Sequence, residues 1–252
     1  MPEFSIISDV HLEFIPDIKF DNFGGENLLL CGDIGKPHTK IYKNFIKLCS
    51  ESFQRVFIIC GNHEYYGFKR ESVHSELETL AAKFNNVYFM NDTVKEFDDF
   101  TIIGATLWSN IPPSIHEEIR GLINDYRYIY KEKGVPITPV DTCRWHHSNV
   151  NFIKKSIEEA TKPVVVMTHH APLFNCVKPE YLTNKNHAFC SDLHELFKPN
   201  VKLWAFGHTH CPFQMDLPTD DEFIHLHNNP VGYPHELDNY NPFDLDNFTW
   251  GW

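Results

Sequence analysis

The sequence has little positive charge. It contains 22 Lys and Arg against 34 Asp and Glu in 252 residues, which gives a formal net charge of -12. Residues 203–252 contain no Lys or Arg at all, although acidic residues occur throughout this stretch. Binding to long nucleic acids or to anionic membranes without specificity requires a basic surface. We therefore expect neither partner for this protein.

Long apolar runs and secretion features are also missing. The longest apolar runs, such as segments 56–60 and 164–167, have four or five residues, whereas a membrane-spanning helix needs about 20 apolar residues. The first apolar run ends at Ser8 and Asp9, unlike the core of a signal peptide. Seven cysteines are an odd number, and none of them has C-x-x-C spacing. This pattern is typical of buried, reduced thiols, so we expect a cytoplasmic protein.

The order of apolar segments predicts a layered α/β fold. No linker, repeat or low-complexity segment divides the chain, so we expect one domain over residues 1–252. Helical periodicity is found in 41–48, in 73–84 and from Thr138 onward, where Thr-Pro-x-Asp is a good helix start. Segment 107–137 is less regular and is interpreted as an insertion that caps one end of the sheet. Short apolar runs predict strands at 4–7, 28–31, 56–60, 87–90, 101–105, 164–167, 203–206 and 223–226.

Polar side chains follow five of these strands directly. Because ligands bind at the carboxyl ends of strands in α/β sheets, the five clusters could meet in one place. Glycines 32, 61 and 207 fit sharp turns where the backbone approaches a ligand. The clusters are Ser8-Asp9-Val10-His11, Gly32-Asp33, Gly61-Asn62-His63-Glu64, Thr168-His169-His170 and Gly207-His208-Thr209-His210.

These clusters contain the ligand types of a two-metal site. Two four-coordinate ions need eight positions, which seven residues supply if one carboxylate bridges. Asp33 is the natural bridge, because it is the only acid in its cluster. A mixed nitrogen and oxygen shell favours Mn, Fe or Zn over Mg or Ca. The predicted ligands are Asp9, His11, Asp33, Asn62, His169, His208 and His210.

The order Asp-x-His, Gly-Asp, Gly-Asn-His-Glu, His, Gly-His-x-His resembles the calcineurin-like metallophosphoesterase superfamily across residues 9–210. The resemblance implies a four-layer α/β/β/α sandwich with two facing β-sheets and the site at the strand ends. It also implies a small phosphorylated substrate and hydrolysis of phosphate mono- or diesters by a hydroxide that bridges two divalent or mixed-valence ions.

The resemblance assigns a role to each motif residue. Asp9, His11 and His210 would hold one ion. Asn62, His169 and His208 would hold the other, with Asp33 shared. His63 would not bind metal but would face the phosphate and donate a proton to the leaving oxygen.

The sequence also departs from parts of the superfamily. Ser/Thr protein phosphatases carry a second Asp and an Arg after Gly-Asp, whereas this chain continues Ile34-Gly35-Lys36-Pro37. An Arg is also expected at the position of Val231. A protein phosphatase is therefore a less favoured alternative. A non-catalytic binding module is another, although such modules lose ligands that this chain retains.

Several neighbouring residues have open interpretations. Tyr65 and Tyr66 could line a substrate pocket or pack in the core. Arg127 could replace the missing phosphate-binding arginine, but a surface ion pair with Asp125 is favoured. His170 follows a predicted ligand, and strand alternation would turn it to the opposite face, which favours a role behind the ligands or in the structure.

Overall fold

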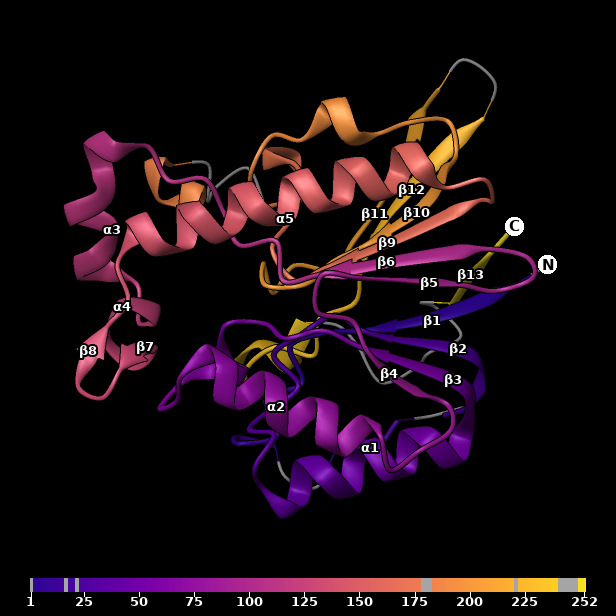
Figure 1. Cartoon of the computed structure of the whole chain (residues 1–252), viewed down its shortest axis with the longest axis horizontal. Helices are drawn as coiled ribbons and strands as arrows, with labels where there is room; N and C mark the ends of the chain where they lie inside the picture. The colour runs from indigo at the N-terminus through magenta and orange to yellow at the C-terminus, as the bar shows by residue number, and fades with distance from the viewer. Residues whose placement is uncertain (1, 16–17, 21–22, 178–182, 220–221, 240–248) are drawn as a thin grey trace.

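A computed structural model describes residues 2–15, 18–20, 23–177, 183–219, 222–239 and 249–252. The parallel strands start near the N-terminal side of the molecule and point toward its centre (Figure 1). Part of the acidic C-terminal stretch, namely Asp220, Asp221, Asp244 and Asp246, lies outside the described residues.

The first sheet has five strands in the order β13-β1-β2-β3-β4. Strands β1 to β4 are parallel, and the C-terminal β13 pairs antiparallel with β1. The described residues Thr249–Gly251 therefore pack back on the first sheet. The strands are β1 (Glu3–Ile7), β2 (Gly25–Leu30), β3 (Phe53–Ile58), β4 (Val87–Phe89) and β13 (Thr249–Gly251).

The second sheet has six strands in the order β11-β12-β10-β9-β6-β5. Its four central strands are parallel, and the two edge strands are antiparallel to their neighbours. The strands are β5 (Thr93–Glu96), β6 (Thr101–Ala105), β9 (Val164–Thr168), β10 (Val201–Ala205), β11 (Phe213–Pro218) and β12 (Phe223–Asn228).

Helices cover the outer face of each sheet, which gives the predicted four-layer α/β/β/α sandwich (Figure 1). Helices α1 (Lys40–Ser52) and α2 (Arg70–Ala81) cover the first sheet, and α5 (Pro139–Glu159) covers the second. The Thr138 backbone N–H donates to Asp141 Oδ2 over 2.9 Å, which confirms the predicted helix start. The 3-10 segments are η1 (His63–Tyr65), η3 (Phe174–Cys176), η5 (Asn184–Ala188), η6 (His194–Leu196) and η7 (Pro234–Asn239).

The core follows from strand alternation. In β9, Val165 and Met167 belong to the cluster between the sheets, whereas Val164 and Val166 pack in the cluster under α5. Strand β9 is thus apolar on both faces, which is why it reads as a continuous apolar run. All seven cysteines are buried, as predicted. In the described part of the chain, no helix is long and apolar enough to cross a membrane.

Segment 107–137 forms an insertion that lies outside the two sheets, near the strand ends (Figure 1). Its last part is a two-stranded hairpin outside both large sheets. The segment consists of η2 (Pro113–Ile115), α3 (His116–Leu122), α4 (Asp125–Tyr128), β7 (Tyr130–Glu132) and β8 (Val135–Pro136).

Candidate metal centre

The predicted ligands come from loops that leave five parallel strands at the same edge of the sandwich. The first sheet supplies them after β1, β2 and β3, and the second sheet supplies them after β9 and β10. The structure therefore brings together residues that are up to 201 positions apart in the chain. This is the convergence that the order of strands and polar clusters predicts.

Most of the predicted ligands have a left-handed backbone conformation, with a positive φ. A positive φ costs a non-glycine residue about 1 to 3 kcal/mol, and such residues concentrate at functional sites. The turn after β1 brings Asp9 and His11 to the same cluster, whereas the turn after β10 directs His208 and His210 to different clusters. The left-handed ligands are Asp9 (φ 51°), His11 (φ 49°), Asp33 (φ 54°), His208 (φ 68°) and His210 (φ 46°).

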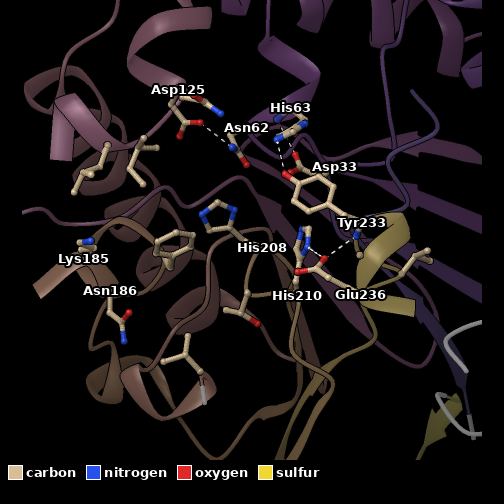
Figure 2. A pocket seen from close by; sticks show the side chains of 18 of the residues that line it. Asp33, Asn62, His63, Asp125, Lys185, Asn186, His208, His210, Tyr233 and Glu236 are labelled. Carbon is tan, nitrogen blue, oxygen red and sulfur yellow. Dashed lines mark hydrogen bonds and ion pairs between the residues drawn. The ribbon is translucent and has the colours of Figure 1, made fainter. Parts of the chain in front are cut away.

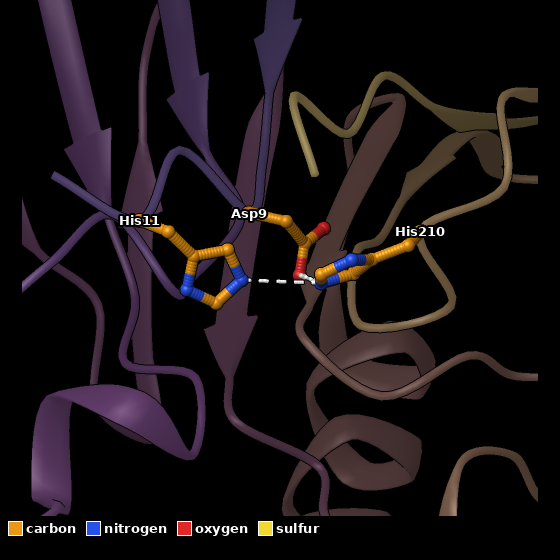
Figure 3. Close-up of side chains that lie close together, drawn as sticks. All are labelled: Asp9, His11 and His210. Atoms are coloured by element: carbon orange, nitrogen blue, oxygen red, sulfur yellow. Dashed lines mark hydrogen bonds and ion pairs between the residues drawn. The ribbon is translucent and has the colours of Figure 1, made fainter. Parts of the chain in front are cut away.

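The first cluster joins Asp9, His11 and His210 (Figure 3). His11 Nε2 lies 3.1 Å from His210 Nε2, which in turn lies 3.5 Å from Asp9 Oδ1. These are the spacings of ligand atoms that surround a shared ion at about 2 Å.

The second cluster joins Asn62, His169 and His208. His169 Nε2 lies 3.0 Å from Asn62 Oδ1 and 3.2 Å from His208 Nδ1. Asp33 stands between the two clusters, because its Oδ2 is 4.0 Å from His11 Nε2 and 3.6 Å from His169 Nε2. This is the position that a bridging carboxylate needs.

The electrostatics of the clusters suit cations. Burial raises the pKa of Asp33 well above its usual range, and Glu64 and Asp9 raise it further. A carboxylate in that place keeps its charge only beside a positive ion. Burial lowers the pKa of His169 to about 4 and that of His208 well below its usual value, so both rings are neutral near pH 7. Neutral imidazole is the form that binds metal, and a nitrogen and oxygen set fits Mn, Fe or Zn.

Groups behind the ligands orient them. His169 Nδ1 is 2.9 Å from Cys31 O, and His210 Nδ1 is 2.7 Å from Glu236 Oε2. Burial would lower the pKa of His210, but its bonds to Asp9 and Glu236 raise it to about 9. Such partners fix the tautomer of a ligating histidine and the orientation of its ring.

A second orienting group acts on Asn62. Its Nδ2 donates to Asp125 Oδ1 over 2.8 Å, which leaves Oδ1 turned toward His169. The Tyr66 hydroxyl donates to the same Asp125 oxygen over 2.7 Å. Asp125 is buried and comes from α4, so the 107–137 segment reaches the site through this carboxylate.

Glu64 fixes the loops that carry two predicted ligands. Its buried carboxylate accepts four backbone N–H bonds, from Asp33, Ile34, Gly35 and Gly61, over 2.7–3.2 Å. The last residue of Gly-Asn-His-Glu is therefore a structural clamp between the loops after β2 and β3.

His63 lies beside the clusters and lines the cleft in front of them. Its backbone N–H donates to Asp33 Oδ1 over 2.7 Å. Its Nδ1 lies 3.1 Å from Glu13 Oε1, and its Nε2 lies 3.3 Å from the Tyr233 hydroxyl. The ring is thus held on one nitrogen by a carboxylate, while the other nitrogen lies near a hydroxyl from the opposite wall.

The cleft has a volume of about 890 Å³ and extends to both sides of the clusters (Figure 2). Lys185 and Asn186 lie on one side of His208, and Tyr233 and Glu236 lie on the other side, near His210. Apolar side chains also line it, namely Leu122, Ile123, Val177, Phe189, Pro212 and Val231.

Several neighbours differ from the expectations. Arg127 is exposed and donates to Gly121 O, so it is neither in the cleft nor paired with Asp125. Tyr66 lines the cleft, whereas Tyr65 is buried against Trp108. His170 does not turn to the opposite face, because β9 ends at Thr168 and alternation stops there. The residue is buried and its ring packs 4.3 Å from the His208 ring, behind a predicted ligand.

Sequence reasoning missed Glu13, Tyr233 and Glu236. Glu13 follows His11 by two residues, a spacing that could have drawn attention to it. Tyr233 and Glu236 come from the loop and 3-10 segment after β12, and no local pattern links them to a histidine 26 residues earlier.

Comparison with known proteins agrees with this geometry. The sequence pattern of the family described as calcineurin-like phosphoesterase matches residues 4–212. Uncharacterized protein L509 of Acanthamoeba polyphaga mimivirus is 34% identical over 275 residues, which cover 95% of each chain. The crystal structure of a phosphopantetheinyl hydrolase from Mycobacterium tuberculosis has a similar fold. Its TM-score is 0.75 at 18% identity, over 97% of this chain and 94% of that one. The chain therefore belongs to the calcineurin-like phosphoesterase family.

Proposed function

We propose that the protein is a binuclear metal-dependent hydrolase of phosphate esters, with phosphodiesters as its preferred substrates. One observation carries the proposal. Two clusters of nitrogen and oxygen ligands share Asp33, whose Oδ2 lies within 4.0 Å of a histidine nitrogen of each cluster. We assign Asp9, His11 and His210 to one ion and Asn62, His169 and His208 to the other. Two bound ions of the Mn, Fe or Zn class would supply an activated water and offset charge on the phosphoryl oxygens.

His63 is the group placed to donate a proton. It faces the cleft. Its backbone N–H donates a hydrogen bond to Asp33 Oδ1, which holds this part of the chain beside both clusters. As the ester bond to phosphorus breaks, its electron pair passes to the leaving oxygen, which takes the proton from His63 Nε2. Tyr233 contacts that nitrogen from the opposite wall in the absence of substrate.

The charge of the cleft favours a diester. A phosphomonoester is largely dianionic near pH 7, whereas a diester carries one negative charge. Lys185 is the one Lys or Arg among the described residues that line the cleft, and it lies away from the clusters (Figure 2). The carboxyl groups of Asp125 and Glu236 lie directly behind the ligands instead. Among the described lining residues, none offers a guanidinium that would bind a second phosphate charge.

The shape of the cleft supports the same choice. It extends from His208 toward Lys185 on one side and from His210 toward Tyr233 on the other. A phosphate held at the clusters therefore has room for an organic substituent in each direction. Because the similar crystal structure is that of a phosphopantetheinyl hydrolase, phosphopantetheinyl esters are the first natural compounds to include in a substrate panel.

The deciding experiment compares bis-p-nitrophenyl phosphate with p-nitrophenyl phosphate in the presence of Mn(II). We expect turnover of both, with the larger kcat/KM for the diester. His63→Asn should lower turnover and leave metal content near that of the wild type. The matched control is His147→Asn, an exposed position on α5 that should change neither.

Each contrary outcome points to a defined alternative. Hydrolysis of a phosphopeptide without hydrolysis of small esters would identify a protein Ser/Thr phosphatase. Absence of turnover with Mn, Fe and Zn across the whole ester panel would identify a non-catalytic binding module. Faster turnover of the monoester would leave the hydrolase in place and refute the diester preference.

A further inference from the structure

Glu13 lies between a predicted metal ligand and the predicted proton donor. Its Oε1 is 3.5 Å from His11 Nδ1 and 3.1 Å from His63 Nδ1. The two rings are 4.5 Å apart and nearly perpendicular, so one carboxylate oxygen reaches both. The Glu13 side chain is only 16% exposed, which limits competition from water.

The position of Glu13 follows from the turn after β1. His11 has a left-handed backbone, and its carbonyl accepts N–H bonds from Phe14 and Ile15 over 2.7 and 3.1 Å. This tight turn brings Glu13 back beside the ring of His11. The loop after β2 pairs with the same turn, because Leu12 N–H donates to Ile34 O over 3.0 Å.

On the basis of the proposed function, we infer that Glu13 is the positioning residue of His63. It accepts the Nδ1 proton of His63 and holds the ring so that Nε2 faces the cleft and carries the proton for the leaving oxygen. After the transfer, His63 is neutral. Its Nδ1 keeps its proton and donates it in a hydrogen bond to Glu13, and solvent returns a proton to Nε2. The chain thereby supplies a carboxylate partner although it lacks the second Asp found after Gly-Asp in protein phosphatases.

The same carboxylate has a consequence for His11. When His11 donates its Nδ1 proton to Glu13, its Nε2 lone pair is left facing His210 and Asp33. That is the tautomer a metal ligand requires. Glu13 therefore couples the orientation of one ligand to that of the proton donor.

The test uses Glu13→Gln, which keeps the size of the side chain and removes its charge. Methyl p-nitrophenyl phosphate releases a weakly basic leaving group that departs without a proton, whereas methyl phenyl phosphate releases a more basic one. General acid catalysis contributes about 10²- to 10⁴-fold. At saturating Mn(II), we expect kcat for the phenyl ester to fall at least about tenfold further than kcat for the nitrophenyl ester.

Two comparisons separate a positioning role from a structural one. Adding His63→Asn to Glu13→Gln should cost little more on the phenyl ester, because both changes remove the same proton transfer. Glu78→Gln, on the exposed side of α2, should leave both esters unaffected. Equal losses on the two esters, or fully additive losses in the double variant, would overturn the inference.

A spectroscopic measurement decides the question independently of turnover. The ¹⁵N spectrum of the histidine rings reports which nitrogen of each ring carries the proton. In the wild type we expect His63 and His11 to be protonated at Nδ1, and in Glu13→Leu we expect this preference to be lost. An unchanged spectrum would refute the role of Glu13 even in a protein that hydrolysed neither ester. Absence of wild-type turnover with the expected spectrum would refute only the proposed function.

Discussion

Adding one methyl group at Gly61 should disable the metal centre. Gly61 precedes Asn62, and its backbone packs directly against the loop that carries Asp33. A Cβ at this position would lie 2.2 Å from Asp33 Oδ1 and 2.6 Å from His169 Cε1. Non-bonded heavy atoms normally lie at least about 3.5 Å apart, so the Asp33 carboxylate or the chain around it must move by about 1 Å.

That displacement is large compared with what a metal site tolerates. Ligand positions are defined to within about 0.2 Å, and a misplacement of about 1 Å can cost 10²-fold in rate. Asp33 Oδ1 also accepts the His63 backbone N–H over 2.7 Å, so the same shift displaces the proton donor. We expect Gly61→Ala to weaken metal binding at least about 100-fold and to lower turnover by a similar factor.

The cost to folding should be smaller. Overpacking a dense interior costs about 1 to 3 kcal/mol, so the metal-free variant should fold with a reduced free energy of unfolding. The measurements are metal content after dialysis, kcat with bis-p-nitrophenyl phosphate, and urea unfolding of the metal-free protein followed by circular dichroism.

Gly121→Ala is the matched control. Gly121 lies in α3, and a Cβ there would meet nothing within 4 Å. This variant should keep full activity and gain up to about 1 kcal/mol of stability from helix propensity. If Gly61→Ala bound two metals and turned over at the wild-type rate, the assignment of Asp33 as the shared ligand would be wrong.

Three further predictions concern charge and metal. Asp33→Asn should lose both ions and all turnover, and a variant with two ions by elemental analysis would contradict the bridge. Chelation should lower the melting temperature, because an ion present at 100 times its Kd stabilises the fold by about 2.7 kcal/mol; a melting temperature insensitive to Mn(II) would argue against tight binding. Acid should destabilise the fold through His146, whose burial lowers its pKa from 6.5 to about 4. Above pH 6.5 both states are neutral, and as the pH falls toward 4 only the unfolded state gains the proton. The free energy of unfolding should therefore drop by up to about 3 kcal/mol over this window, and His146→Gln should flatten the urea-unfolding profile there.

The sequence contained enough information for the central strands and for the ligand set. Continuous apolar runs such as 164–167 are read correctly because these strands are buried on both faces. The order of polar clusters after the strands then determines which side chains converge. The edge strands β5 and β11 escaped prediction because they are short or half-exposed, so their apolar signal is weak.

The partners behind the ligands could not be predicted in the same way. Asp125 reaches Asn62 from 63 residues away, and Glu236 reaches His210 from 26 residues away. Such contacts depend on how the 107–137 segment and the loop after β12 fold back on the sandwich. Neither segment has a periodic pattern that would fix its path, so only the structure identifies these carboxylates.

The division of each cluster between the two sheets has a consequence for the order of assembly. The first sheet supplies Asp9 and His11 while the second supplies His210, and the second cluster is divided in the same manner. Each of the two proposed ions would thus take ligands from both sheets, so neither half of the sandwich holds a complete ligand set. If two ions bind as proposed, their ligand sets are complete only after the two sheets have docked. Full coordination of the ions would then be a late step of folding.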